Sequence, residues 1–320
     1  MNSILLIFTG LVLFLYALNN LSLGLKDVSG DKLKVFLDLF TNNVVKGILS
    51  GIVVTVLLDS SSVVIIMTIA LVNSKALTFR QAMGVVMGAN IGTTFSSQIF
   101  ALDIGEYAAI PIGVGFILMF FFKKNFLNSL GRVIFSFGLI FFGLFTMEQA
   151  VEPLKESDYF VSWLASLDNP WRGMFTGTFV TIVVQSSSAT VGMIIGLASQ
   201  NMISIAGGIA VMLGAELGTC ADTLVASIGR SRAAIKTGLF HLLFNICTII
   251  LGMLLLPFFT QLILYISKGA SLSQTIANAH MLFNGLGVLL MLPFVPLHEK
   301  FLTWLFPDKS SVNIQVAGAS

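Results

Sequence analysis

The sequence predicts an all-α polytopic membrane protein, and three observations lead to that class. The chain of 320 residues is 56% hydrophobic and only 10% charged, whereas ordinary globular proteins are about a quarter charged. Its mean hydropathy is +0.95. Long stretches carry no charge, and a bilayer core takes about 20 apolar residues per helix. The 17 Lys and Arg against 15 Asp and Glu leave no basic surface that would suggest a nucleic-acid partner.

The weakly charged stretches predict about seven full membrane crossings and two segments that are long but polar in the middle. The apolar stretches lie at residues 4–25, 47–74, 81–102, 107–122, 131–147, 173–229, 237–267 and 269–297. The two polar-centred segments surround Asp59 and Gln185. Each is too long for one helix, so we expect a helical hairpin that enters and leaves the membrane on the same side.

An internal repeat organises the chain. A shift of 126 positions places residues 47–102 over residues 173–228 without a gap. Both copies contain three consecutive serines, followed 28 positions after the first serine by a G-A-x-x-G-T motif. We therefore expect a first repeat at residues 1–125, with its hairpin at about 35–73, and a second at 126–268, with its hairpin at about 160–200. Residues 269–320 would form an additional C-terminal helix and a short polar tail.

The distribution of charge gives each repeat a direction. If the first span runs from outside to inside, most Lys and Arg fall in cytoplasmic loops, as the positive-inside rule requires. The first repeat then has three crossings, so the second repeat must be inverted. We expect a multi-pass protein of the inner (plasma) membrane, with the N-terminus outside and the C-terminus in the cytoplasm. Inverted repeats with interrupted helices at the bilayer midplane are typical of transporters.

The serine triplets are the first candidate site. Broken backbone at mid-membrane is tolerated only where protein or a water-filled cavity satisfies its polar groups. Hydroxyls and free carbonyls suit a small cation, whereas free N–H groups at the start of a helix suit an anion. One break can therefore hold both ions of a cation-coupled anion transporter. The predicted residues are Asp59, Ser60, Ser61 and Ser62 in the first repeat, and Gln185, Ser186, Ser187 and Ser188 in the second.

The G-A-x-x-G-T motifs are the second candidate site. Their glycines permit close helix approach, and we assign a binding role to their polar residues, which are Asn90, Thr93, Glu216 and Thr219. Ionisable groups within a membrane are costly and therefore mark candidate sites. The first repeat has its carboxylate at the serine triplet (Asp59) and its amide at the glycine motif (Asn90), whereas the second repeat has the reverse, with Gln185 and Glu216. We expect Asp59 and Glu216 to help hold cations, and the sequence leaves open whether Asp222 does so or only reaches towards the membrane surface.

An H-x-x-F-N pattern occurs twice near the C-terminus, at His241 to Asn245 and at His280 to Asn284. Residues at i and i+4 share a helix face, so we expect these side chains to form supporting polar contacts between helices. A transition-metal site would need more ligands at suitable spacing. A proton relay is the alternative, because histidine titrates near neutrality.

Taken together, the motifs resemble the sodium-dependent inorganic phosphate cotransporter family, which comprises the type II Na+/phosphate cotransporters and their bacterial relatives. That family is marked by two inverted repeats, each with a Q-S-S-S motif followed by G-A/S-N-I-G-T, and the resemblance covers roughly residues 4–295. It implies sodium-coupled symport of inorganic phosphate by alternating access, with Na+ as coupling ion, no cofactor and no enzymatic activity. The implied binding residues are Ser60, Ser61, Ser62, Asn90, Thr93, Thr94, Gln185, Ser186, Ser187, Ser188 and Thr219.

The chain departs from the family pattern at two charged positions. Asp59 stands where the family usually has Gln, and Glu216 stands where it usually has Asn. Both change the charge of the site, so the sodium number, proton coupling and even the transported anion stay open. The closest alternative is a sodium- or proton-coupled carrier of another small oxyanion. A passive channel would also use oxygen-lined breaks. An intramembrane serine protease would need one serine paired with a base. The oligomeric state does not follow from the sequence.

Overall fold

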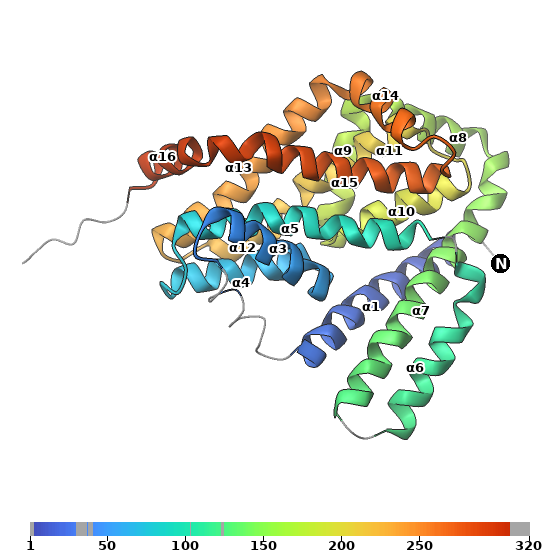
Figure 1. The fold of residues 1–320 in the computed structure, drawn as a ribbon. Coiled ribbons are helices and arrows are strands. Elements are labelled where there is room, and N and C mark those ends of the chain that lie inside the picture. The colour runs from blue at the N-terminus through green and yellow to red at the C-terminus, as the bar shows by residue number, and fades with distance from the viewer. Residues whose placement is uncertain (1–2, 30–36, 38–40, 103, 123–124, 308–320) are drawn as a thin grey trace, which may run out of the picture.

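The computed structural model describes residues 3–29, 37, 41–102, 104–122 and 125–307, and within them it contains helices and no strands (Figure 1). The beginning of the first expected hairpin, near residue 35, and the expected polar tail after residue 307 lie outside the described residues. The α-helices are α1 Ser3–Ser29, α3 Val44–Leu58, α4 Ser61–Asn73, α5 Phe79–Phe100, α6 Ala109–Phe121, α7 Asn125–Val151, α8 Asp158–Ala165, α9 Pro170–Val184, α10 Ser187–Ser199, α11 Ile205–Gly218, α12 Cys220–Ser227, α13 Arg232–Leu254, α14 Leu256–Ile266, α15 Leu272–Met291 and α16 Val295–Leu305. Short 3₁₀ turns lie at Gly105–Tyr107, Glu152–Glu156, Ser166–Asp168 and Leu292–Phe294.

Helices α3, α4 and α5 form what we call the first unit, residues 44–100. Local sequence sets where these helices begin. Asn43 caps α3 by accepting a hydrogen bond from the backbone N–H of Lys46, at 2.9 Å. Thr78 and Gln81 form a capping box at the start of α5. These caps satisfy backbone donors that have no partner within the helix.

Helices α9 to α12 form the second unit, residues 170–227, and they follow the same plan. Asn169 caps α9, whose first residue is Pro170, a position where proline is favoured because its missing N–H is not needed. Ser204 caps α11. The units differ at one place: α5 runs unbroken through Thr93, whereas the equivalent helix of the second unit ends at Gly218 and resumes as α12 at Cys220.

In each unit the outer helix packs closely on the motif helix, α3 on α5 and α9 on α11. A Cβ added to Gly88 would lie 2.0 Å from the carbonyl oxygen of Ile48, and one added to Gly214 would lie 1.9 Å from that of Met174. The shift of 126 positions maps the first of these contacts onto the second. The glycines therefore allow the backbones to touch, as the sequence predicts for them.

Five described helical segments are long and apolar enough to cross a membrane. They are Ser3–Val28, Phe126–Glu156, Ile205–Ser227, Arg232–Leu254 and Leu272–Leu305. A sixth is reached if Phe79–Phe100 and Gly105–Phe121 count as one bent span. The expected seven crossings exceed this number. One reason is that the helical part of residues 107–122, which we expected to cross alone, is only the 13-residue α6. Another is that α5 carries many polar side chains, among them Asn90.

The C-terminal helices join the two units. Helix α15 packs on α5 and α11, and α13 packs on α4, α5, α11 and α12. Helix α1 packs on α7 and α7 on α6, and in Figure 1 these three extend away from the rest of the molecule. Among the described residues, Ser136 is the only buried polar side chain of the α1–α6–α7 group.

Candidate functional site

The chain is interrupted in the same way at both serine triplets. Helix α3 ends at Asp59, which adopts a left-handed conformation with φ 51° and ψ 32°. Helix α9 ends at Gln185, with φ 57° and ψ 31°. The following serine, Ser60 or Ser186, is extended and caps the next helix through its side chain. Because left-handed backbone is uncommon outside glycine, the recurrence of these two values shows that both breaks share one geometry.

Each break presents the start of a new helix. The hydroxyl of Ser60 accepts a hydrogen bond from the N–H of Val63 at 3.3 Å, and the hydroxyl of Ser186 accepts one from Ala189 at 3.1 Å. The first N–H groups of α4 and α10 have no acceptor within their own helix. Ser61 and Ser187, whose N–H groups these are, are 6% and 5% exposed. Each break therefore offers buried N–H groups and the positive end of a helix dipole.

One contact joins the triplet of the first unit to the motif of the second. The hydroxyl oxygens of Ser62 and Thr219 lie 3.4 Å apart. Thr219 is also where α11 gives way to α12. Thr93 and Thr94, at the matching motif of the first unit, donate instead to carbonyls of their own helix, those of Ala89 and Ile91. The two motif helices thus place their threonines differently.

A cavity of about 380 Å3 lies beside the second break. Its lining includes the predicted residues Gln185 and Thr219, together with Thr181, Gly218 and Asp222. The structure therefore brings two predicted site residues to one space. Asp222, whose role the sequence left open, faces the same space.

The first break has two hydrogen-bond partners that the sequence does not predict. The hydroxyl of Ser96 on α5 donates a hydrogen bond to Asp59. The hydroxyl of Ser22 on α1 donates to the carbonyl of Leu58 at 2.9 Å, and so satisfies one of the free carbonyls at the end of α3. A signal for Ser96 existed, because the shift of 126 positions pairs Ser96 with Asp222. Nothing in the sequence marks Ser22.

Glu216 lies in a buried polar network rather than at a serine. Its carboxylate oxygen Oε1 is 2.7 Å from Nε2 of His280 and accepts a hydrogen bond from Asn284 at 3.2 Å. Glu216 is 3% exposed and His280 is fully buried. The other ring nitrogen of His280 lies 2.6 Å from the hydroxyl of Ser97 on α5. Helix α15 therefore connects the carboxylate of the second unit to the motif helix of the first.

Asn245 extends this network to α13. Its side-chain nitrogen donates to the backbone carbonyl of Glu216 at 2.6 Å, and its side-chain oxygen accepts from Asn90 at 2.7 Å. One turn earlier, Nδ1 of His241 lies 2.9 Å from the hydroxyl of Thr223. The residues predicted as supporting polar contacts thus lie between helices. Glu216 and Asn90 bond to α13 and α15 rather than directly to a serine of either triplet.

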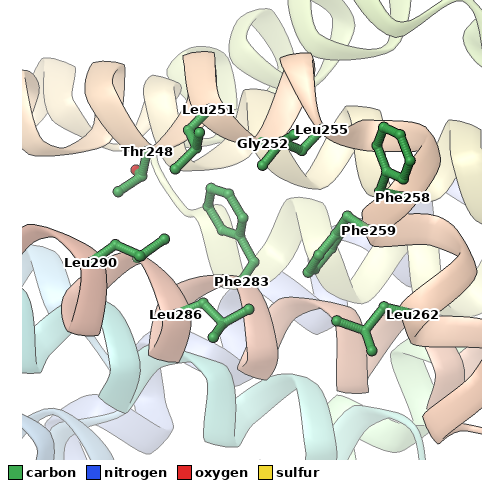
Figure 2. Close-up of a pocket in the computed structure, with 11 residues that line it drawn as sticks. Thr248, Leu251, Gly252, Leu255, Phe258, Phe259, Leu262, Phe283, Leu286 and Leu290 are labelled. Carbon is green, nitrogen blue, oxygen red and sulfur yellow. The ribbon is translucent and has the colours of Figure 1, made fainter.

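A second cavity, of about 210 Å3, is apolar and lies between α13, α14 and α15. Figure 2 shows Phe283 and Leu286 of α15 on one side of it and Thr248 and Leu251 of α13 on the other. None of the predicted site residues lines it. Its lining is hydrocarbon apart from the hydroxyl of Thr248, which donates to carbonyls of its own helix, so an ion is better placed at the breaks. In the described part of the chain no group of three or more His, Cys, Asp or Glu side chains could hold a metal ion.

A polytopic helical chain with broken helices and buried polar groups is typical of membrane transporters. The family model described as Na+/Pi-cotransporter matches residues 13–149 and again residues 154–291. The chain therefore belongs to the Na+/Pi-cotransporter family, and as a member it is a multi-pass phosphate-transport protein.

Three relatives illustrate the range of this similarity. YqeW of Bacillus subtilis, whose name gives no function, is 29% identical over 96% of this chain and 99% of its own length. The "Putative inorganic phosphate export protein YjbB" of Escherichia coli is 25% identical over 92% of this chain, which spans 54% of that protein. The human "Sodium-dependent phosphate transport protein 2B" is 35% identical over 32% of this chain and 16% of its own length. No solved structure matches the chain.

Proposed function

We propose that this protein is a secondary active transporter that carries inorganic phosphate together with Na+ by alternating access. The observation that carries the proposal is the pair of identical helix breaks at Asp59-Ser60 and Gln185-Ser186. Discontinuous helices with these properties bind anionic substrate groups at their N-terminal ends and alkali cations at freed oxygens. The contact between Ser62 and Thr219 supports a site shared by the two units.

The chemistry divides between two kinds of group. The N–H groups at the first turns of α4 and α10 suit phosphate oxygens, because a helix N-terminus is a ready anion site. Hydroxyls, carbonyls and carboxylates suit Na+, which prefers oxygen ligands. We assign phosphate to the buried serines, chiefly Ser61 and Ser187, and cations to the surrounding oxygens. Asp59 and Glu216 supply negative charge that offsets the coupling ions.

The two units also support an inverted-repeat arrangement. The family model matches the chain twice in succession, and the glycine contacts of the first unit recur in the second. We propose repeats at residues 1–125 and 126–268, with re-entrant hairpins ending near residues 73 and 200. The N-terminus would lie outside and the C-terminus in the cytoplasm. Rocking of one repeat against the other would then open the site to each side in turn.

The names of the relatives are compatible with one coupled carrier. One relative is named for sodium dependence and another for export. A symporter moves its substrates in whichever direction their combined gradients favour, so coupling and physiological direction are separate questions.

The test is uptake of radiolabelled phosphate into proteoliposomes that contain the purified protein. An inward Na+ gradient should drive accumulation, whereas an equal choline gradient should not. Uptake that proceeds equally with either cation would contradict sodium coupling and favour a channel. Stronger competition by sulfate than by unlabelled phosphate would favour the other-oxyanion carrier, and uptake driven by a proton gradient alone would favour proton coupling.

A matched pair of variants links this activity to the breaks. Ser61→Ala and Ser187→Ala remove buried hydroxyls at the two first turns and should each strongly reduce sodium-driven uptake. Ser162→Ala, in the exposed helix α8, should leave uptake unchanged. Full uptake by both site variants would place the phosphate elsewhere.

A further inference from the structure

The cavity beside the second break has an unusual lining for a carrier of anions. Thr181, Gln185, Gly218 and Thr219 are uncharged, and Asp222 is the only charged side chain that lines the space. Within the described residues no Lys, Arg or His lies at ion-pair distance from the Asp222 carboxylate. A carboxylate that lies within a membrane-spanning segment is costly unless a counter-charge accompanies it. The space is therefore electronegative and would repel phosphate that entered without a cation.

The carboxylate of Asp222 is held in a defined place. The backbone N–H of Thr223 donates to its Oδ1 at 2.6 Å, in the first turn of α12. The hydroxyl of Ser62 on α4 lies near this carboxylate. Ser62 in turn lies 3.4 Å from Thr219, hydroxyl to hydroxyl. One carboxylate and two hydroxyls from both units thus converge beside the cavity.

The repeat explains why an acid stands at this position. The shift of 126 positions places Gln185 on Asp59 and Asp222 on Ser96. In the first unit the pair is an acid at the break and a hydroxyl on the motif helix, joined by a hydrogen bond from Ser96 to Asp59. In the second unit the pair is an amide at the break and an acid on the motif helix, and both line one cavity. Each unit therefore has one carboxylate near its break, at the end of α3 in the first unit and on α12 in the second.

We propose that Asp222 binds a sodium ion, together with the hydroxyls of Ser62 and Thr219. This inference rests on the proposed function and adds a cation site of the second unit that is equivalent to the surroundings of Asp59. Hard cations such as Na+ are held by carboxylate, hydroxyl and carbonyl oxygens. The cation would neutralise Asp222 and let phosphate approach the N-terminus of α10. Loading of this site would therefore precede or accompany phosphate binding.

The test compares Asp222→Asn with Asp158→Asn, which makes the same chemical change at an exposed residue of α8. Two readouts are used: the half-saturating Na+ concentration for phosphate uptake, and the rise in melting temperature when NaCl replaces choline chloride in detergent. Asp222→Asn should raise the half-saturating Na+ concentration at least about tenfold, which corresponds to about 1.4 kcal/mol. It should also diminish the sodium-induced rise in melting temperature. Asp222→Glu should restore part of both, and Asp158→Asn should change neither.

Unchanged sodium activation and an unchanged sodium-induced melting shift in Asp222→Asn would overturn the site. If that variant fails to fold, Asp222→Ser, which installs the residue found at the matching position of the first unit, replaces it under the same criteria. The melting shift also separates this inference from the proposed function. If phosphate uptake proves independent of Na+ in the wild-type protein, the symport proposal fails. A sodium-induced shift that depends on Asp222 would still establish the cation site.

Discussion

The two units share a backbone but distribute their charges differently. Both break in the left-handed region at the residue before the serine triplet, and both rest a glycine-bearing motif helix against the outer helix. Their carboxylates, however, occupy different places: Asp59 ends α3, whereas Glu216 and Asp222 lie on the motif helix and its continuation. The comparison shows that the glycine contacts and serine caps recur in both units and keep the same backbone, while the acidic residues stand at different sequence positions in the two units.

A second difference concerns the motif helix itself. In the first unit it is continuous, and Thr93 bonds to its own helix. In the second it is interrupted at Thr219, whose hydroxyl faces Ser62 across the units. We infer that the second unit supplies the threonine that reaches the first triplet, so the site is not symmetric. Four predictions test this comparison.

The largest effect is expected where the units are most alike. Gly88→Ala and Gly214→Ala would each place a Cβ about 2 Å from a backbone carbonyl oxygen. Neither backbone can yield without separating two helices, so the free energy of unfolding should fall by more than about 4 kcal/mol. Both variants should therefore lose most of their folded protein. Fluorescence-detected size-exclusion chromatography after heating measures the folded fraction.

Gly285→Ala is the control for this prediction, because nothing lies within 4 Å of a Cβ built at Gly285. It should retain the wild-type melting temperature. If only one of the two packed variants unfolds, the close contact of the other unit would not be essential to the fold, and the structural equivalence of the units would be weakened.

The next effect concerns the buried network around Glu216, a carboxylate that has no acidic counterpart on the motif helix of the first unit. His280→Ala would leave the buried carboxylate of Glu216 without its shortest hydrogen bond, and removing one partner of a buried hydrogen bond costs about 1–3 kcal/mol. We expect a clear fall in melting temperature. The double variant Glu216→Gln/His280→Ala should recover part of that loss, because an amide is less costly to bury than an unpaired acid.

His298→Ala serves as the comparison, since His298 is half-buried, packs edge-on against Phe240 and bonds to the carbonyl of Phe294 rather than to a buried carboxylate. A melting temperature of His280→Ala equal to that of His298→Ala would show that the Glu216–His280 contact does not stabilise the protein.

Features that depend on neighbouring residues could be predicted from the sequence, whereas contacts between residues far apart in the chain could not. The helical class, the membrane spans at 4–25 and 131–147 and the breaks at Asp59 and Gln185 could be predicted, because hydropathy and serine capping act over neighbouring residues. The contact of Ser62 with Thr219 could only be anticipated as a meeting of the two repeats. Its partners lie far apart in the chain, and their separation depends on how α4 packs on α12.

Other features escaped prediction for identifiable reasons. Ser22 bonds to the end of α3 from a helix that also carries Asn19 and Asn20, so nothing in the sequence singles out that serine. The seven expected crossings were counted from charge-free length, which does not reveal that α6 is short. The position of Glu216 beside His280 was hidden as well, because an H-x-x-F-N pattern shows that two polar residues share a helix face but not which helix they meet.

A smaller effect is expected from exchanging the residues at the two breaks. Asp59→Gln gives the first unit the residue that the second unit carries, and Gln185 shows that glutamine adopts the required left-handed backbone. The variant should therefore fold. We expect its half-saturating Na+ concentration for phosphate uptake to rise about tenfold, the equivalent of about 1.4 kcal/mol of cation binding. Unchanged sodium dependence and stoichiometry would reject a cation-binding role for Asp59.

The smallest effect should appear at the caps, where the units are equivalent. Ser60→Ala and Ser186→Ala each remove a side chain that accepts from the first turn of the next helix, a loss of about 1 kcal/mol. Because the two breaks have the same geometry, the falls in melting temperature should match each other. Ser→Asn at either position should retain most of the stability, since asparagine is an equally good cap. A large fall at one serine and none at the other would show that the two caps, despite their equal geometry, do not contribute equally to the stability of their helices.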